Sequence, residues 1–493
     1  MKVLLIHPNC GFQFVPQTAP LGLMAIATYL KQRGDLVRVY DRNVEKLSLG
    51  KLLRDFRPDA AGLCVASMMH LRDGVRLSRR LRNEGIPVIW GGHMATIEPE
   101  MILRENAADF VVMGEGEVTF HELLRALENN GELRQIAGIA FRERGEIHIA
   151  PERAFADPAD LPAIDWSLVD PEKYFAPLYG SRKMMYLYTS KGCPGSCTFC
   201  INTGYHHSRV RQRPNSYVLS EIRTLTEKHG MDGVYFTDEI FGLNKTALHD
   251  LCRRLQCLEL GITWGCETKL GLLRREDLQA MYDAGCRWIY FGVESGSPEM
   301  QKRIRKNLDL EKIEEELQCC RQIGISTTCG IIVGFPDETQ AQLLETVRLL
   351  QRLDPNLIQA LAFFPMPGSA ACAGLVNEGR LTLPRTLREW SRYAPLTGMF
   401  GNFSNVPTRD LLVIQSFFSW RSFVHREFPK GAARRYAFAL NTIVTSLRNI
   451  LRQGFFSMFL YAFSSARLFL TIAWYANAYP AVRRKYGLRR KRP

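Results

Sequence analysis

Cys193-Pro194-Gly195-Ser196-Cys197-Thr198-Phe199-Cys200 places three thiols at the spacing C-x3-C-x2-C within a single loop. The loop follows an apolar run at residues 184–188 that predicts a β-strand. Thiolates are soft ligands that suit iron–sulfur clusters, and such clusters usually take four protein ligands. Three local cysteines therefore predict a cluster with one iron left to bind another molecule. A zinc site is the alternative, although zinc usually recruits a second cysteine or histidine pair, and none stands out in this sequence.

This stretch resembles the cluster loop of the radical S-adenosylmethionine (SAM) superfamily, including the aromatic Phe199 before the third cysteine. The resemblance implies that Cys193, Cys197 and Cys200 hold a 4Fe–4S cluster whose fourth iron chelates the amino and carboxylate groups of SAM. It also implies that one electron from the cluster cleaves the sulfonium and yields a 5′-deoxyadenosyl radical. An external electron donor of the flavodoxin or ferredoxin type is then an expected partner.

Composition bounds the class of protein. The chain has 493 residues, enough for two to four domains, and an ordinary globular composition with 46% hydrophobic and 23% charged residues. Thirteen cysteines suggest no disulfide framework, and no secretory signal is recognised at the N-terminus. We therefore expect a reducing, cytoplasmic setting, which suits an oxygen-labile cluster. The net charge of +14 resides in residues 421–493, which hold fifteen Lys or Arg and one acid.

Residues 1–145 alternate short apolar runs with helical patterns. Strands are predicted at 2–6, 37–41, 60–65, 87–90 and 110–113, and helices at 21–31, 52–56 and 72–84. This alternation predicts a Rossmann-like, doubly wound parallel sheet. Ligands of such sheets bind beyond the carboxyl ends of the strands, where glycines let the backbone approach a flat or phosphate-bearing ligand.

In front of a radical SAM core, this layout resembles the cobalamin-binding domain of one large subfamily. The D-x-H-x-x-G motif, whose histidine ligates cobalt in other cobalamin enzymes, is absent, because the first strand runs into His7-Pro8-Asn9-Cys10-Gly11. Three alternatives stay open: cobalamin with no protein ligand to cobalt, ligation by His7, His70 or His93, and a domain that has lost cobalamin. The cobalamin-binding set implied by the resemblance is Pro20, Leu21, Gly22, Asp41, Ser67, Gly91, Gly92, His93, Gly114, Glu115, Gly116 and Glu117.

Residues 146–180 carry five prolines and predict an ordered linker. Residues 181–390 then repeat strand and helix. Six β/α units predict a partial (β/α)6 TIM-type barrel, with its chemistry at the carboxyl ends of the strands. Strands are predicted at 184–188, 233–239, 262–269, 288–295, 327–333 and 358–364, and helices at 220–229, 248–259, 277–284, 310–323 and 338–353.

The predicted strand ends resemble the SAM-binding segments of the superfamily. Residues 237–239 resemble the segment that contacts the methionyl ammonium, and Lys269 lies where a basic residue meets the carboxylate or ribose. Residues 294–295 resemble the segment near the ribose and amino group, and residues 330–334 match a G-x-I-x-G pattern that lies along adenine. A salt-bridged acid at a strand end is the plainer interpretation of Asp238 or Glu294 taken alone. The implied SAM-binding set is Phe199, Thr237, Asp238, Glu239, Lys269, Glu294, Ser295, Gly330, Ile332 and Gly334.

Residues 391–493 are rich in aromatic and basic residues and are predicted to be mostly helical. The stretch at 455–475 is long enough to span a membrane, but Arg467 near its middle would cost about 3 kcal/mol there. A helix at an anionic membrane surface is favoured over a span, because apolar faces flanked by Arg and Lys suit that location. A helical cap with a solvated basic tail is the plainer interpretation. Nucleic-acid binding is disfavoured, because the basic tail follows the apolar stretch.

These parts favour an enzyme over a binding protein. The leading interpretation is a cobalamin-dependent radical SAM C-methyltransferase, in which the 5′-deoxyadenosyl radical activates an unactivated carbon and methylcobalamin supplies the methyl group. The expected substrate is a hydrophobic or lipid-like small molecule. Cyclase, ring-rearranging or hydroxylating chemistry without methyl transfer is the first alternative, and a non-catalytic cobalamin or redox sensor is the second. A tRNA methylthiotransferase is disfavoured, because those enzymes carry a different, cysteine-bearing N-terminal domain.

Overall fold

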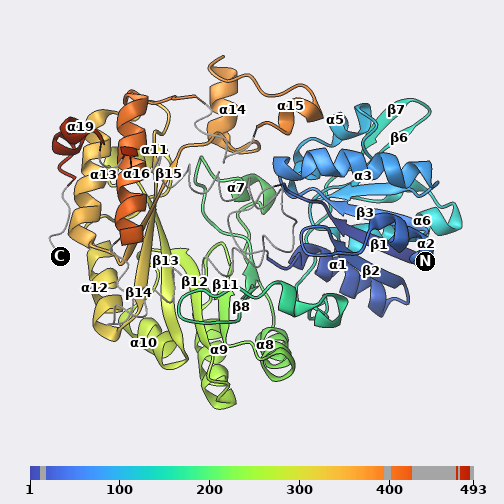
Figure 1. Ribbon diagram of the computed structural model, residues 1–493, viewed down its shortest axis with the longest axis horizontal. Helices are drawn as coiled ribbons and strands as arrows, with labels where there is room; N and C mark the ends of the chain where they lie inside the picture. The colour runs from blue at the N-terminus through green and yellow to red at the C-terminus, as the bar shows by residue number, and fades with distance from the viewer. Residues whose placement is uncertain (12–17, 394–400, 425–473, 476–477, 489–493) are drawn as a thin grey trace. The chain divides into compact units, whose positions relative to one another are not determined.

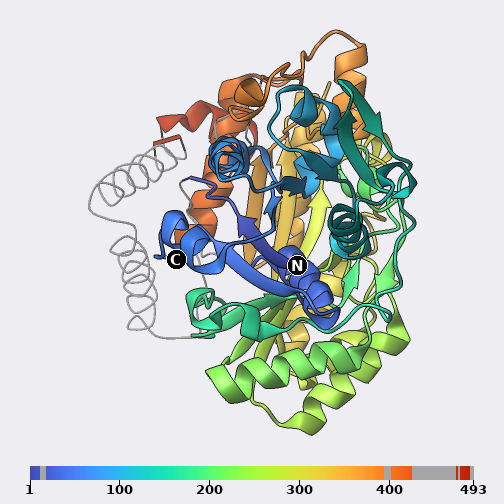
Figure 2. The same ribbon diagram turned by 90° about the vertical axis from the view of Figure 1, so that its right-hand side faces the viewer.

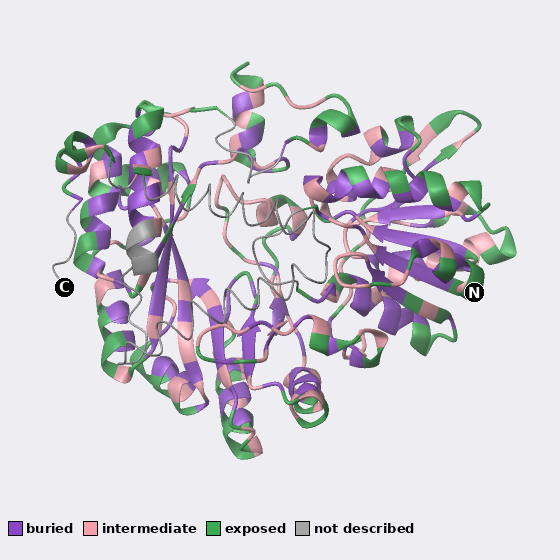
Figure 3. Ribbon diagram, viewed as in Figure 1, coloured by how far each residue is buried: buried purple, intermediate pink, exposed green. Residues whose placement is uncertain are grey.

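The computed structural model describes residues 1–11, 18–393, 401–424, 474–475 and 478–488, which fall into two compact units (Figures 1 and 2). Each unit is built on its own sheet, and most strand residues of both sheets are buried (Figure 3). The first unit comprises Met1–Phe175, Arg211–Met231 and Cys372–Gly398, and the second comprises Ala176–Val210, Asp232–Ala371 and Met399–Pro493.

The first unit contains a seven-stranded sheet in the order β2-β1-β3-β4-β5-β6-β7. Strands β1 to β5 run parallel, and β6 and β7 add an antiparallel hairpin. The predicted Rossmann-like sheet is thus confirmed. Its elements are β1 (Lys2–His7), α1 (Leu21–Gln32), β2 (Leu36–Asp41), α2 (Leu49–Phe56), β3 (Ala60–Cys64), α3 (Leu71–Asn83), β4 (Val88–Gly91), α4 (His93–Ile97), α5 (Pro99–Arg104), β5 (Phe110–Val112), α6 (Gly116–Asn129), β6 (Ile139–Glu143), β7 (Glu146–Ile149), α8 (Asn215–His229) and α15 (Leu387–Trp390).

Helices cover both faces of this sheet, because its buried strands send apolar side chains to both sides. Along β4, Ile89 packs in a core with Leu23 of α1 and Phe120 of α6. The next residue, Trp90, faces α3 and donates its indole N–H to Oγ of Ser78 at 2.9 Å. Figure 1 draws α1 and α3 on opposite sides of the sheet. The chain passes from β1 outward to β2 and then returns to β3 on the other side of β1, so β1 and β3 flank the topological switch point.

Helix α6 and the β6–β7 hairpin are not predicted from the sequence. Helix α6 begins at Gly116, where an added Cβ would lie 2.7 Å from Cδ1 of Ile26, so this glycine permits close packing of α6 on α1. The hairpin carries the sheet to Ile149, past the predicted domain boundary at residue 145.

The second unit contains a six-stranded sheet in the order β15-β14-β13-β12-β11-β8, with all neighbouring strands parallel. The predicted partial TIM-type barrel is confirmed. Its elements are β8 (Met184–Leu187), β9 (Ser190–Lys191), α7 (Asn202–Tyr205), β11 (Gly233–Phe236), α9 (Lys245–Leu258), β12 (Thr263–Lys269), α10 (Arg275–Asp283), β13 (Cys286–Glu294), α11 (Pro298–Arg303), α12 (Ile313–Ile323), β14 (Ser326–Val333), α13 (Gln340–Leu353), β15 (Leu357–Ala362), α16 (Thr408–Val424) and α19 (Pro480–Lys485).

Capping residues set where the barrel helices start. Oδ1 of Asn244 accepts the backbone N–H of Ala247 at 3.1 Å, so α9 starts at Lys245, ahead of the predicted residue 248. A capping box of Thr339 and Gln342 places the first residue of α13 at Gln340, two residues after the predicted start at residue 338. Apolar periodicity finds the buried turns of a helix, whereas the cap decides its first residue.

The described part of the C-terminal region packs on the second unit. The buried carboxylate of Asp410 on α16 accepts hydrogen bonds from Lys485 Nζ at 2.8 Å and from the Tyr486 hydroxyl at 3.2 Å, which fastens α19 to α16. Among the residues described, no helix has both the length and the apolar character needed to cross a membrane. Most of the predicted apolar stretch at 455–475 lies outside the described residues.

Candidate cofactor sites

The three motif cysteines lie in a loop between β9 and α7. All three thiols are free and half-buried. In the described parts of the chain, no group of three or more His, Cys, Asp or Glu side chains could hold a metal ion between them. The thiolates of an iron–sulfur cluster bind different irons, so they need not converge on one point. The three thiols on this loop are the ligand set that the sequence predicts for a cluster.

The loop backbone is held by long-range hydrogen bonds. The N–H of Thr198 donates to the carbonyl of Ile304 at 2.9 Å, and the carbonyl of Thr198 accepts the N–H of Ala371 at 2.8 Å. Gly195 lies close to two thiols, since an added Cβ would be 3.3 Å from Sγ of Cys193 and 3.8 Å from Sγ of Cys197. The thiols are thus presented by a loop whose shape does not depend on metal alone.

Asp238 anchors the start of this loop. It follows β11, has no exposed surface, and accepts hydrogen bonds from the N–H of Thr189 at 2.9 Å and from the hydroxyls of Thr189 and Ser190, both at 2.6 Å. Burial raises the pKa of Asp238, and these donors oppose the rise. Protein donors surround the carboxylate, so Asp238 acts in this structure as a positioning residue for the loop.

Glu239, the next residue, holds the loop from another point. Its carboxylate accepts the N–H of Gly192 at 2.9 Å and lies 3.4 Å from Nε2 of His206. Burial alone would raise the pKa of Glu239, but His206 and the backbone donors bring it below the ordinary value, so the group is ionised. Thr237 is exposed, although its hydroxyl donates to the carbonyl of Leu187 at 3.1 Å. Thr237 and Glu239 are the members of this triplet that keep exposed surface.

Glu294 forms a half-buried ion pair with Lys306 at 3.1 Å. It adopts φ +67° beside a register irregularity in β13, a left-handed backbone that is unusual for glutamate. An added Cβ at Gly292 would lie 2.5 Å from Oε1 of Glu294 and 2.8 Å from Nζ of Lys306, so this glycine makes room for the pair. Burial by itself would lower the pKa of Lys306, but the charges of Glu294 and the nearby Cys197 outweigh that effect. The pKa is therefore above its ordinary value, and the ammonium stays charged.

Two lysines influence the thiols. Burial raises the pKa of Cys197, and the charges of Lys306 and Lys269 oppose that rise. Lys269 ends β12 and is half-buried, and within the described residues its ammonium has no hydrogen bond or ion pair. A cationic group without an anionic partner beside the cluster loop suits the carboxylate of SAM.

The other predicted SAM residues shape the barrel backbone. Ser295 has no exposed surface, and its hydroxyl lies 3.2 Å from the hydroxyl of Thr346 on α13. An added Cβ at Gly330 would lie 1.9 Å from the hydroxyl of Tyr290, so only glycine fits there. Gly334 has φ +82° and donates its N–H to Oε2 of Glu338 at 2.7 Å.

Ile332 and Phe199 border apolar surfaces of the second unit. Ile332 pairs in register with Leu361 of β15, which is 48% exposed. The ring of Phe199 lies 5.6 Å from the ring of Phe335. The predicted adenine segment therefore adjoins accessible apolar surface as well as packed aromatic rings.

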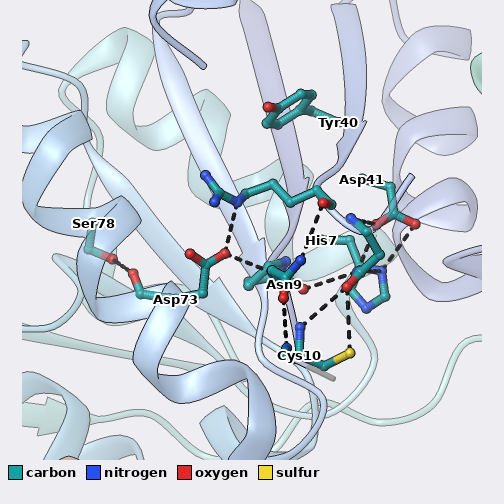
Figure 4. A network of polar contacts seen from close by, with 12 residues as sticks. His7, Asn9, Cys10, Tyr40, Asp41, Asp73 and Ser78 are labelled. Atoms are coloured by element: carbon teal, nitrogen blue, oxygen red, sulfur yellow. Dashed lines mark hydrogen bonds and ion pairs between the residues drawn. The ribbon is translucent and has the colours of Figure 1, made fainter. Parts of the chain in front are cut away.

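In the first unit, the carboxyl ends of β1 and β2 carry a polar network (Figure 4). Nδ1 of His7 lies 3.4 Å from Oδ2 of Asp41, its neighbour in register. Asn43 donates its backbone N–H at 2.9 Å and its amide at 2.8 Å to Oδ1 of Asp41, and the Tyr174 hydroxyl donates to Oδ2 at 3.2 Å. Burial alone would raise the pKa of Asp41, but His7 and Asn43 bring it below its ordinary value, so the carboxylate is ionised.

His70 follows β3 and packs beside this network, with its ring 5.1 Å from that of His7. Nδ1 of His70 accepts the N–H of Ser67 at 3.2 Å. Burial and the charge of His7 lower the pKa of His70 to about 4, so the ring is neutral at physiological pH. His93 starts α4, after Gly92 with φ +94°, where an added Cβ would lie 3.1 Å from the backbone N of Ala66.

Some of the remaining predicted cobalamin residues are glycines with free space around them, and others are side chains already bonded or packed within the protein. An added Cβ at Gly22 or Gly114 meets nothing within 4 Å, and one at Gly91 meets only a carbonyl at 3.7 Å. Gly91 and Gly114 leave room for a large, flat ligand at the strand ends, and Gly22 does so in the first turn of α1. Glu115 instead receives a two-pronged ion pair from Arg211, at 2.6 and 2.8 Å. The other members are Pro20 and Leu21 at the start of α1, and Gly116 and the buried Glu117 in the first turn of α6.

Several site residues are missed by the sequence reasoning. Lys306 and His206 belong to no motif, and only the folded chain brings them to the cluster loop. Arg211 lies far along the chain from its partner Glu115, so no local pattern reveals it. Asn43 could be found, because the order Asp41-x-Asn43 suits an Asx turn in which the first side chain accepts the N–H of the second.

Two family models match the chain. The Radical SAM superfamily matches residues 187–350, which include the cluster loop, and the B12 binding domain matches residues 13–124. An uncharacterized methyltransferase of Pyrococcus horikoshii is 30% identical over 80% of this chain and 87% of its own length. An anaerobic magnesium-protoporphyrin IX monomethyl ester cyclase of Synechocystis is 27% identical over 74% of this chain and 75% of its own.

A more distant relative is named a hopanoid methylase, and a solved structure shares the fold. The hopanoid C-3 methylase of Methylococcus capsulatus is 25% identical over 75% of this chain and 71% of its own. The radical SAM methyltransferase TsrM of Kitasatospora setae, solved with cobalamin and a [4Fe-4S] cluster, superimposes with a TM-score of 0.67 at 19% identity. That match covers 80% of this chain and 85% of TsrM.

Proposed function

Because this chain belongs to the radical SAM superfamily, among the members that carry a B12-binding domain, we propose that it is a C-methyltransferase acting on an unactivated carbon of a largely apolar small molecule. Its cofactors are a 4Fe–4S cluster, SAM and cobalamin. The observation that carries methyl transfer is the 30% identical relative named a methyltransferase, which aligns with four fifths of this chain. When bound, the cluster and SAM supply a carbon-centred radical, and cobalamin supplies the methyl group.

The chain's own residues hold and orient these groups. Cys193, Cys197 and Cys200 would bind the cluster, and Lys269 would meet the carboxylate of SAM, because its ammonium has no anionic partner among the described residues. The ion pair with Glu294 holds the Lys306 ammonium in a fixed position near the loop. Asp238 and Glu239 accept hydrogen bonds from the residues that lead into the loop, and these bonds hold the loop and its thiols in position.

An apolar substrate fits the accessible face of the barrel. In β15, Ile358 and Ala360 are buried, whereas the alternate residues Gln359 and Leu361 are exposed. An exposed leucine beside Ile332 leaves apolar surface within the second unit that a hydrophobic molecule would cover. The hopanoid methylase among the relatives supports a lipid-like substrate.

The proposal includes contact of the C-terminal residues with an anionic membrane surface. Trp474 is 54% exposed, and Arg484 on α19 is exposed as well. An exposed indole with neighbouring cations suits a membrane interface. In a flotation experiment with vesicles that contain anionic lipid, the full chain should float with the vesicles. A variant truncated after residue 480 should stay at the bottom of the gradient. Equal, negligible flotation of both forms would remove the membrane contact from the proposal.

Product analysis tests the enzymatic proposal. The protein is reconstituted anaerobically with iron, sulfide and cobalamin, and is then given reductant and SAM. A methyltransferase yields both 5′-deoxyadenosine and S-adenosylhomocysteine. Deoxyadenosine alone, with candidate substrates present, favours cyclase or hydroxylase chemistry, and the absence of both products favours a sensor. Cys197→Ala should abolish cleavage, whereas Cys257→Ala, which changes an exposed free cysteine, should not.

A further inference from the structure

Two histidines flank the topological switch point of the first unit. His7 is the last residue of β1, and His70 closes the short turn after β3. Ligands of open α/β sheets bind at this point, outside the carboxyl ends of the strands. The side chain of His7 keeps 15% of its surface exposed, whereas Nε2 of His70 and Nε2 of His93 have essentially no accessible surface. His93 is as a residue half-buried, like His7, but its Nε2 is enclosed, so His7 is the candidate whose Nε2 is not among the enclosed atoms.

The hydrogen bonds around His7 place its proton. The two amide hydrogens of Asn43 are used by Oδ1 of Asp41 at 2.8 Å and by the carbonyl of Pro8 at 3.2 Å. Asn43 therefore has no hydrogen left for Nδ1 of His7, although the two atoms lie 3.5 Å apart. The carboxylate of Asp41, with Oδ2 3.4 Å from Nδ1, is the acceptor that remains, so this geometry favours a proton on Nδ1. The lone pair that can bind a metal is then on Nε2, which has no partner among the described residues.

His70 has the opposite tautomer. Its Nδ1 accepts the N–H of Ser67 at 3.2 Å, so the proton of the neutral ring is on Nε2. A protonated, buried nitrogen cannot ligate a metal. His70 instead lies against His7, with ring centroids 5.1 Å apart at 35°, and limits the rotation of the His7 ring.

An imidazole whose Nδ1 faces a carboxylate and whose Nε2 is open is the arrangement that proteins use for metal-ligating histidines. Resting on the cobalamin-dependent function proposed above, we propose that His7 Nε2 ligates the cobalt of bound cobalamin and that Asp41 orients and strengthens this ligand. Tyr174 and Asn43 serve as positioning residues, because both donate to the carboxylate of Asp41. The missing D-x-H-x-x-G histidine is thereby replaced by a histidine at the strand end.

Electron paramagnetic resonance tests this ligand directly. The full chain is produced with either natural or 15N-labelled histidine, loaded with cobalamin, and reduced to the Co(II) form. A histidine nitrogen on cobalt splits each cobalt line into three with 14N and into two with 15N. We expect the change from three to two lines in the labelled protein. His7→Gln should lose the histidine coupling, whereas His148→Gln, which changes a histidine on the β7 hairpin, should keep it.

Asp41→Asn tests the backing carboxylate, with cobalamin affinity reduced about 10- to 100-fold, as for other residues that orient metal ligands. Bound cobalamin with no nitrogen splitting, or with three lines that labelling leaves unchanged, would overturn the role of His7 while leaving the proposed function intact. Failure of the unaltered protein to bind cobalamin would overturn the cofactor assignment itself. The labelling experiment needs no substitution, so its result holds even where His7→Gln fails to fold.

Discussion

The hydroxyl of Thr189 donates a 2.6 Å hydrogen bond to the fully buried carboxylate of Asp238. Thr189 leads into the cluster loop, and Asp238 follows the neighbouring strand β11. The bond therefore joins the end of one barrel strand to the segment that carries the thiols. The sequence predicts a contact between Asp238 and SAM, and in the structure the same carboxylate also supports the loop.

Asp238→Asn should destabilise the iron-free protein by about 2 kcal/mol, because an amide cannot accept all of the donors that the carboxylate accepts. Urea unfolding of the iron-free chain measures the loss. Asp55→Asn, at an exposed position of α2, is the control and should change the free energy of unfolding by less than about 0.5 kcal/mol. Unchanged stability with weakened SAM binding would instead assign Asp238 to the ligand.

Lys306→Met should reduce the free energy of unfolding by roughly 3 kcal/mol, because it leaves the half-buried carboxylate of Glu294 without its partner. Adding Glu294→Gln should restore part of that loss, since the orphaned charge is then removed. A double-mutant cycle by chemical denaturation measures the coupling. Strictly additive losses in the double variant would show that the two side chains do not act as a pair.

Gly330→Ala should strongly destabilise the barrel, because the new Cβ would lie 1.9 Å from the hydroxyl of Tyr290. Tyr290→Phe in the same chain should recover part of the stability by removing the nearest atom. Gly374→Ala in α14 (Ala370–Asn377) is the control, since nothing lies within 4 Å of its Cβ and alanine favours a helix. Thermal unfolding ranks the variants, and a Gly330→Ala protein as stable as the parent would contradict the packing.

Glu338 makes stability depend on pH. Burial raises the pKa of this carboxyl from 4.5 to about 7. Between these values the folded state keeps a proton that the unfolded chain has released, so the stability of the parent should fall as pH rises through this window and level off above it. Glu338→Gln resembles the protonated form and should remove about half of this slope, because burial also raises the pKa of Glu316 to about 7. Denaturation at intervals from pH 4 to 8 measures it, and parallel profiles would refute the assignment.

Both sheets are predictable from the sequence because buried parallel strands appear as continuous apolar runs, as in Val234-Tyr235-Phe236. The β6–β7 hairpin escapes that signal, since its partly exposed strands mix charged and apolar residues. Helix ends are displaced for a different reason, because capping residues rather than apolar periodicity decide them.

The cluster ligands are predictable because three cysteines in eight residues are a local signal. The roles of the neighbouring acids are less so, and strand alternation does not separate them. Tyr235 and Phe236 are both buried, so the two faces of this strand give no sign that Asp238 is buried while Thr237 and Glu239 are exposed. Lys306 has no local signal either. It reaches its position through a turn in which Arg305 and Asn307 both adopt positive φ, which only the fold reveals.

The Thr198 backbone has a consequence for how this chain can vary. Between Cys197 and Cys200, Thr198 bonds to Ile304 through its N–H and to Ala371 through its carbonyl. An insertion or deletion between these two cysteines, where Thr198 and Phe199 lie, would break both bonds even in a protein that never meets iron. Two independent constraints therefore act on the number of residues between these cysteines. One is ligation of the metal, and the other is the pair of hydrogen bonds to segments more than a hundred residues away along the chain.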